Sequence, residues 1–134
     1  MLRPTCLKCS FQLNGKKQIH AMWHMICANG IQVVEDAPPR VVGDEVVLGI
    51  TDTYIFSSTG NTVVNPITCR FRFRDGLIVE HRDECDAKSW AQKAMGGVQG
   101  WLAGRITFLR RKAAREKMTG FIGKHPEYRE TKHV

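Results

Sequence analysis

The sequence predicts a single α+β domain in which a meander of long antiparallel strands is flanked by helices. Apolar residues recur every three or four positions along residues 16–28, which is the spacing of a helix. Along much of residues 45–85, polar and apolar residues alternate, as they do in strands that bury one face. Asp75-Gly76 interrupts this pattern and is a strong signal for a tight hairpin. We therefore treat residues 1–134 as one domain, a length that fits a single core.

The composition is that of an ordinary globular protein, with 43% hydrophobic and 25% charged residues. No stretch approaches the roughly 18 apolar residues of a membrane span. The N-terminus carries no pattern of a secretory signal, and the cysteine count of five is odd, which favours reduced thiols. These features predict a cytoplasmic protein without a membrane partner.

The net charge of +7 is concentrated near the C-terminus. From residue 105 onward there are nine bases and three acids, so this segment carries +6 of the total. A nucleic-acid-binding face is usually spread over the fold or interleaved with aromatic residues. We interpret the basic cluster as the solvated face of a last helix, and keep a nucleic-acid contact through residues 105–117 as the less favoured alternative.

Four strands are predicted between the first helix and the C-terminal helices. They cover residues 31–36, 45–57, 62–74 and 77–85. Ala37-Pro38-Pro39 ends the first strand because proline cannot donate to a ladder. In the third, alternation predicts that Phe71 and Phe73 are buried and that Arg70 and Arg72 are exposed.

The C-terminal third is predicted to hold two helices. The first covers residues 87–95, with Trp90 and Ala94 on one face, and ends at Gly96-Gly97. A glycine-rich linker that carries Trp101 follows, and residues 105–122 form the last helix. Its apolar side is predicted to contain Ile106, Leu109, Ala113, Met118, Phe121 and Ile122. Residues 124–134 form a polar tail with frayed ends.

No metal site and no cofactor are predicted. Cys6 and Cys9 form one Cys-x-x-Cys, but no second pair of ligands follows at zinc spacing, so we interpret them as ordinary cysteines. His20 and His24 lie four residues apart in the first helix, without the glutamate of the metalloprotease motif. We interpret them as part of a solvated helix face, and His125 as part of the polar tail.

Several segments together resemble a known superfamily. They are the helix AMWHMIC, the hairpin RFRDGLIVEHRDECD at residues 72–86 and the C-terminal GGVQGWLAGRITFLRRKAAREKMTGFIGKHPEY. From Leu13 to Tyr128 the chain is similar to nuclear transport factor 2-like proteins, in their bacterial polyketide-cyclase-like, ketosteroid-isomerase-related branch. The resemblance implies a strongly curved antiparallel sheet, also described as cystatin-like, that forms a cone around a helix.

The N-terminus departs from that family. Members usually begin with a helical hairpin and a strand that carries an aspartate, which serves as general base in ketosteroid-isomerase-like enzymes. Only twelve residues precede Leu13 here, and near the expected aspartate the sequence reads Cys6-Leu7-Lys8-Cys9-Ser10. That role therefore cannot be transferred to a residue of this chain. A cone that lacks the hairpin would expose apolar surface, which predicts a homodimer or a higher oligomer.

Five polar residues are predicted to face the cone. They are Asp52, Tyr54, Asn65, His81 and Asp83. The predicted apolar lining consists of Trp23, Ile50, Phe56, Ile67, Phe71 and Val79. A carboxylate in apolar surroundings has a raised pKa, so Asp52 or Asp83 can serve as acid or base, as can His81. Tyr54 can donate to a developing oxyanion. Alternatively, His81 and Asp83 only bond their neighbours, and Tyr54 is a satisfied core tyrosine.

Two functions follow from this reading. The chain is predicted to bind a small apolar or partly polar molecule, and to act on it as an acid/base isomerase, a cyclase or an epoxide-hydrolase-like enzyme. The alternative is a non-catalytic binding or dimerisation module. Because the family's aspartate has no counterpart, the sequence leaves enzyme activity open between the two.

Overall fold

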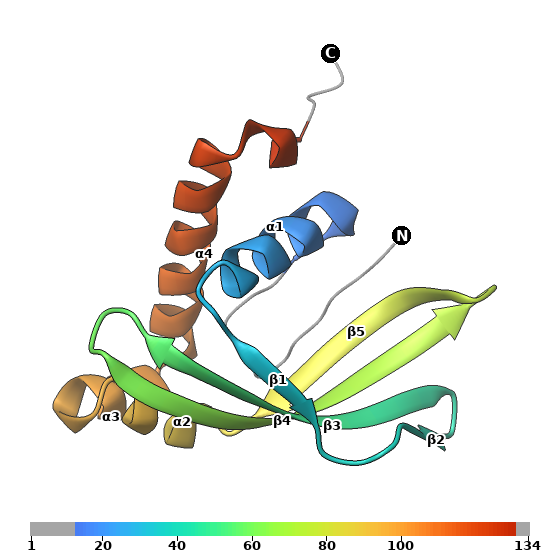
Figure 1. Cartoon of the computed structure of the whole chain (residues 1–134), viewed down its shortest axis with the longest axis horizontal. Helices are drawn as coiled ribbons and strands as arrows, with labels where there is room; N and C mark the ends of the chain where they lie inside the picture. The colour runs from blue at the N-terminus through green and yellow to red at the C-terminus, as the bar shows by residue number, and fades with distance from the viewer. Residues whose placement is uncertain (1–12, 131–134) are drawn as a thin grey trace.

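One curved antiparallel sheet is the centre of the fold (Figure 1). The structure is a computed structural model, and it describes residues 13–130. Its elements in chain order are α1 (Gly15–Cys27), β1 (Gln32–Glu35), β2 (Arg40–Val42), β3 (Glu45–Phe56), β4 (Asn61–Arg74), β5 (Leu77–Cys85), α2 (Ala87–Ala94), α3 (Gly97–Arg105), α4 (Thr107–Lys124) and the 3-10 helix η1 (Pro126–Tyr128). The strand order is β1-β3-β4-β5, with β2 paired to β3, and the sheet does not close. The predicted α+β class with a curved antiparallel sheet is confirmed.

Two long hairpins form most of the sheet. β3 pairs with β4 along its whole length, from Glu45 opposite Arg72 to Phe56 opposite Asn61. The turn between β4 and β5 is Asp75-Gly76, with φ of 52° and 75°, as the sequence predicts. Aspartate and glycine tolerate these left-handed angles better than most residues do. The short strand β2 was not predicted, because the prolines before it suggested a loop.

The predicted burial of Phe73 is wrong. Phe73 is 48% exposed, whereas Phe71 is half-buried. The pairing of β4 with β5 shifts between Arg72 and Phe73, so that Phe73 lies opposite Ile78. Beyond this irregularity the hairpin tip extends past the packed region, and Leu77 is 70% exposed. Alternation along one strand does not reveal where the core ends.

On β3, β4 and β5, the face of the sheet opposite Phe71 carries an ion-pair network. Arg70 pairs with Glu45 at 3.3 Å and Arg72 pairs with Glu80 at 2.7 Å, and Arg82 also contacts Glu45. Arg72 is exposed as predicted, with 44% of its side chain accessible, but Arg70 is only 30% accessible. The expectation of a simply solvated arginine face is therefore incorrect for Arg70. We call this side of the sheet the charged face, defined by Glu45, Arg70, Arg72, Glu80, Arg82 and Glu84.

Helix α2 begins where the sequence predicts, but the glycine-rich linker after it is a helix. Asp86 caps α2 by accepting from the backbone of Lys88 and Ser89. Gly96 and Gly97 have positive φ and separate α2 from the segment that follows, as the sequence predicts. The segment that carries Trp101 is then helix α3. Its glycines suggested a linker because glycine lowers helix propensity.

The glycines of α3 are explained by its packing against α2. A Cβ atom at Gly100 would lie 2.8 Å from the carbonyl oxygen of Ala91, and one at Gly104 would lie 2.9 Å from Cα of Lys88. Real side chains essentially never make such contacts with backbone. The two helices therefore approach one another at positions that only glycine permits.

The buried side of α4 differs from the prediction. Arg110, Ala114 and Met118 are the buried residues, while the predicted core residues Ile106 and Leu109 are 39% and 42% exposed, and Ala113 is also exposed. Arg110 is 8% exposed and donates to the carbonyl of Ala103 at 2.7 Å. The cationic cluster is therefore not entirely a solvated face, because one of its members anchors α4 to α3.

Helix α1 packs against α4 and η1. Leu13, Ala21 and Met118 form the small core of this helical layer, with Tyr128 beside it. The polar tail is ordered as η1 up to Tyr128, so the expected fraying does not apply to that part. The Cys6–Cys9 pair, His133 and the segment expected to carry the family's aspartate lie outside the described residues.

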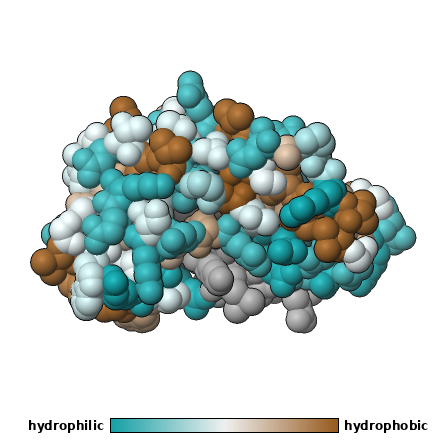
Figure 2. All heavy atoms as spheres, turned by 90° about the horizontal axis from the view of Figure 1, so that it is seen from below, coloured by the Kyte–Doolittle hydropathy of each residue, from teal (hydrophilic) through white to brown (hydrophobic). Residues whose placement is uncertain are grey.

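Hydrophobic side chains on the face seen from below lie in separate groups among hydrophilic ones (Figure 2). The exposed apolar residues of the described chain include Ile55 and Val64 of the sheet and Val98 and Phe108 of the helices. None of the helices between residues 13 and 130 is long and apolar enough to cross a membrane.

Candidate functional site

Strand pairing brings the predicted polar residues to one side of the sheet. Asp52 lies opposite Asn65 in the β3–β4 pair, and β4 residues Cys69 and Phe71 lie opposite Asp83 and His81. Side chains alternate along a strand, so these paired residues and those two positions away from them share one face of the sheet. We call it the site face, defined by Ile50, Asp52, Tyr54, Phe56, Val63, Asn65, Ile67, Cys69, Phe71, His81, Asp83 and Cys85.

His81 and Asp83 form a hydrogen-bonded pair on this face. Nε2 of His81 lies 2.6 Å from Oδ1 of Asp83, and both side chains are partly buried. The ring of Phe71 stacks on the imidazole, with centroids 4.4 Å apart. Because the two residues are two positions apart in β5, both point to the same side and can share a proton. Val79, also predicted to line the cone, is half-buried in β5 near the shift in strand register.

Cys69 is part of the same cluster, although no motif in the sequence marks it. Its thiol is buried and hydrogen-bonded to Asp83. Burial raises the pKa of the Cys69 thiol well above its usual range, and the charge of Asp83 raises it further, so the thiol stays protonated at neutral pH. Parity with Ile67 and Phe71 placed Cys69 on this face, but only the pairing with β5 puts it opposite Asp83.

Asp52 is the carboxyl whose pKa is most clearly changed. Burial raises the pKa of Asp52 from 3.8 to about 6, and the negative charge of Asp83 contributes to the rise. At neutral pH the carboxylate therefore predominates, while the protonated form remains accessible. A group with this property can accept a proton and return it within one reaction cycle.

Tyr54 is held by α2. The indole Nε1 of Trp90 donates to the hydroxyl oxygen of Tyr54 at 2.6 Å, and the Trp90 ring meets Phe56 edge-on at 5.9 Å. Burial raises the pKa of Tyr54, so its hydroxyl stays protonated. A tyrosine that accepts from tryptophan keeps its own proton for donation. Asn65 is buried beside these residues and is hydrogen-bonded to the thiol of Cys85.

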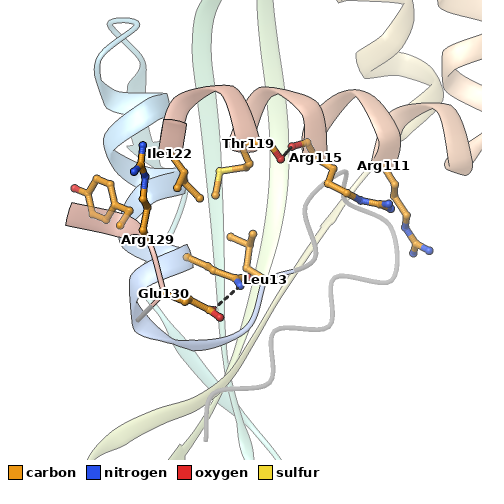
Figure 3. A pocket seen from close by; sticks show the side chains of 10 residues that line it. Leu13, Arg111, Arg115, Thr119, Ile122, Arg129 and Glu130 are labelled. Atoms are coloured by element: carbon orange, nitrogen blue, oxygen red, sulfur yellow. Dashed lines mark hydrogen bonds between the residues drawn. The ribbon is translucent and has the colours of Figure 1, made fainter. Parts of the chain in front are cut away.

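Two hollows of the described chain lie away from Asp52, His81 and Asp83, and only the second reaches the site face, at Cys85. One, of about 300 Å³, is lined by residues of α1, α4 and η1, and Arg111, Arg115 and Arg129 are among them (Figure 3). The other lies beside Thr68 and Arg110. The predicted site residues line neither of them. Trp23 belongs to α1 and is 37% exposed, so its place beside the site face stays a prediction.

One set of side chains on the site face has the chemistry of metal ligands. Single ligand atoms of Cys69, His81 and Asp83 all lie within 4.8 Å of one another. A metal would require the Cys69 thiol to lose its proton, against the raised pKa that burial imposes. The hydrogen bonds among the three residues instead suit proton sharing.

The raised pKa of Asp52 predicts a pH-dependent stability. A carboxyl with a folded pKa above its unfolded value stabilises the fold when protonated, and this contribution is lost as the pH rises from about 4 to about 6. A shift of this size corresponds to at most about 3 kcal/mol, or about 1–2 kcal/mol for a half-buried group. Asp52→Asn should therefore be more stable than the wild type by about 1–2 kcal/mol at pH 7.5 and nearly equal at pH 3.5.

Urea unfolding of both proteins at the two pH values measures this difference. Asp75→Asn in the β4–β5 turn is the matched control, since asparagine tolerates its φ of 52° and Asp75 lies outside the site face. A stability difference between Asp52→Asn and wild type that does not change with pH would contradict the burial of Asp52.

Comparison with solved structures identifies the same fold in several proteins. A proposed SnoaL-like polyketide cyclase from Jannaschia sp. CCS1 matches with a TM-score of 0.59 and 22% identity, over 72% of each chain. A protein with a ketosteroid isomerase-like fold from Catenulispora acidiphila, in complex with trimethylamine, matches with a TM-score of 0.59 and 15% identity, over 69% of this chain and 72% of that one. An LEH-like epoxide hydrolase from M. tuberculosis matches with a TM-score of 0.55 and 18% identity, over 72% and 71%.

These identities are low, so the likeness establishes the fold alone. No curated protein matches the sequence. The model of the SnoaL-like domain, in contrast, matches residues 7–81, which is more than half of the 134 residues and includes α1, most of the sheet and His81. The chain therefore belongs to the SnoaL-like domain family.

Proposed function

We propose that this protein binds a small, partly apolar molecule against the site face and moves a proton on it, with Asp52 as the acid–base group. The observation that carries the proposal is the placement of a carboxyl with a pKa of about 6 on the same face as the His81–Asp83 pair. Membership of the SnoaL-like family supports it, as do the names of the cyclase and epoxide hydrolase that share the fold.

The reaction that fits these groups is proton transfer next to a carbonyl. The ionised carboxylate of Asp52 takes a proton from carbon, and the electrons of the broken C–H bond move onto the carbonyl oxygen. The hydroxyl of Tyr54 donates a hydrogen bond to this developing oxyanion. Protonated Asp52 then returns the proton to a different carbon, which completes an isomerisation without any other reactant. His81 and Asp83 hold a polar group of the ligand, and Phe71 and Ile67 contact its apolar part.

The second candidate is a binding module without catalysis. One observation favours it: the sheet does not close. An open face binds ligands with less exclusion of water, which weakens the electrostatic effects that catalysis uses. In this case, His81 and Asp83 would orient a ligand without transferring a proton to it.

A hydrogen-exchange assay distinguishes the two functions. The full chain is incubated in D2O with cyclic β,γ-unsaturated ketones and 1,3-diketones, and mass spectrometry follows deuterium incorporation and double-bond migration. Binding of the same probes is measured by native mass spectrometry. For an acid–base enzyme, Asp52→Asn should lower the exchange rate about 100-fold or more, and the wild-type rate should rise as the pH passes through 6.

Asp83→Asn tests ligand positioning and should weaken probe binding about tenfold. Asp75→Asn serves again as the control and should leave exchange and binding unchanged. Binding without exchange would establish the module instead of the enzyme. If none of the probes binds the wild type, the proposal that the site face binds small carbonyl compounds is wrong.

A further inference from the structure

A second cluster of ligand-type side chains lies outside the site face, where the end of α1 meets the end of α4. His24 is in the last turn of α1, His125 ends α4 and Glu127 belongs to η1. One ligand atom of each lies within 4.8 Å of the others. The first residue is about a hundred positions from the other two, so the fold and not a local motif brings them together.

Neighbouring side chains hold these rings in orientation. Nδ1 of His24 lies 3.0 Å from the hydroxyl of Tyr128, which leaves Nε2 of His24 as its outer nitrogen. The ring of His125 stacks on Phe121 at 4.1 Å and meets His24 edge-on at 4.9 Å. Metal-binding histidines are commonly oriented by such a hydrogen bond on the second ring nitrogen.

The carboxylate of Glu127 is the third ligand-type group of this cluster. Oε1 of Glu127 lies 3.1 Å from Nδ1 of His125, and 54% of the Glu127 side chain is exposed. Zinc–ligand bonds of about 2.0–2.2 Å require the three atoms to move closer together than they are here. The exposed side chain of Glu127 can make most of this adjustment by rotation, while the two imidazole rings keep their contacts with Tyr128 and Phe121.

We propose that His24, His125 and Glu127 bind a divalent transition metal of the zinc class. Two imidazoles and one carboxylate suit zinc, cobalt, nickel or copper, whereas magnesium and calcium prefer oxygen ligands alone. Three protein ligands leave at least one coordination position for water. The metal ties α1 to the C-terminal segment, and α1 otherwise packs on α4 and η1.

The inference is independent of the proposed reaction, because none of these residues belongs to the site face. The test uses the full chain with Cys6→Ser and Cys9→Ser, which removes the Cys-x-x-Cys pair as a competing ligand. Titration calorimetry with Zn2+ gives stoichiometry and affinity, and visible absorption with Co2+ reports the ligand type. We expect one Zn2+ per chain and a Co2+ spectrum without a thiolate charge-transfer band.

Variants locate the site. His24→Gln and His125→Gln should each weaken Zn2+ binding more than tenfold, and Tyr128→Phe should weaken it about tenfold through the lost orientation of His24. His20→Gln, on the same helix but outside the cluster, should leave the affinity unchanged. Zn2+ should raise the Tm of the parent protein but not of His24→Gln. Because Glu127 is exposed, Glu127→Gln should fold normally and still bind Zn2+ more weakly.

Three results would overturn the proposal. They are the absence of stoichiometric Zn2+ binding, equal affinity in the parent and in His24→Gln, His125→Gln and Glu127→Gln, and a Co2+ spectrum with a thiolate band, which would place the metal at one of the remaining thiols, Cys27, Cys69 or Cys85. In the first case the residues form a metal-free aromatic contact between α1 and η1.

Discussion

Replacing Gly100 with alanine is expected to destabilise the protein by about 2 kcal/mol, which lowers the Tm by roughly 6–8 °C. The added methyl group would lie 2.8 Å from the carbonyl oxygen of Ala91 and 3.3 Å from Cα of Gln92. Both are backbone atoms, so no side-chain rotation relieves the contact, and α2 and α3 have to separate. The effect opposes the gain of about 0.5–1 kcal/mol that alanine normally brings to a helix interior.

Gly120→Ala is the matched control for this prediction. Gly120 lies in α4, and no atom would lie within 4 Å of its added Cβ. This variant should stabilise the protein by about 0.5–1 kcal/mol. Thermal unfolding of both variants and the wild type measures the difference. Equal shifts for the two variants would show that α2 and α3 do not pack through Gly100.

Replacing Arg110 with alanine is expected to cost about 2–4 kcal/mol. The guanidinium is buried and donates to the carbonyl of Ala103 at 2.7 Å and to the hydroxyl of Thr107 at 3.3 Å. The Ala103 carbonyl lies in the last turn of α3, where backbone acceptors lack a partner within the helix. Arg110→Ala therefore leaves this carbonyl without a donor and also removes the packing of the arginine side chain. Arg110→Met should recover only the part of the unfolding free energy that comes from packing.

Lys112→Ala removes the same charge from the same helix. The Lys112 side chain is 60% exposed and reaches Glu116 at 4.0 Å, a contact worth a few tenths of a kcal/mol at most. Its unfolding free energy should lie within about 0.5 kcal/mol of the wild type. If Arg110→Ala behaves like Lys112→Ala in urea unfolding, Arg110 is a solvated surface residue and the anchor between α3 and α4 does not exist.

Patterns within one strand or one turn predicted the sheet well. The β4–β5 turn followed from Asp75-Gly76, and the shared face of His81 and Asp83 in β5 followed from a period of two, whereas the family resemblance added Asp52 to that face. The position of Cys69 opposite Asp83 required the register between strands, which one strand's pattern does not contain. The exposure of Phe73 was missed for a related reason, because the shift in pairing occurs between two strands.

The helices were predicted less completely because their contacts are distant in sequence. In the sequence alone, the glycines of α3 indicate a flexible linker. In the structure, Gly100 lies against the backbone of Ala91, so the same glycines indicate a close contact between two helices. A basic cluster predicts solvent exposure, but Arg110 has an acceptor in the preceding helix. Likewise, His24 and His125 carry no motif in the sequence, and only the packing of α1 on η1 brings them together.

The charged face includes the strand at one edge of the sheet, β5. In the described chain β5 pairs with β4 alone, so its other edge presents backbone groups that another strand can extend. Glu80, Arg82 and Glu84 alternate along this strand and are held in place by Arg72, Glu45 and Arg70. An incoming strand would have to place its own side chains beside this row of charges, which disfavours an apolar strand. The ion pairs that join neighbouring strands thus also limit the growth of the sheet into larger aggregates.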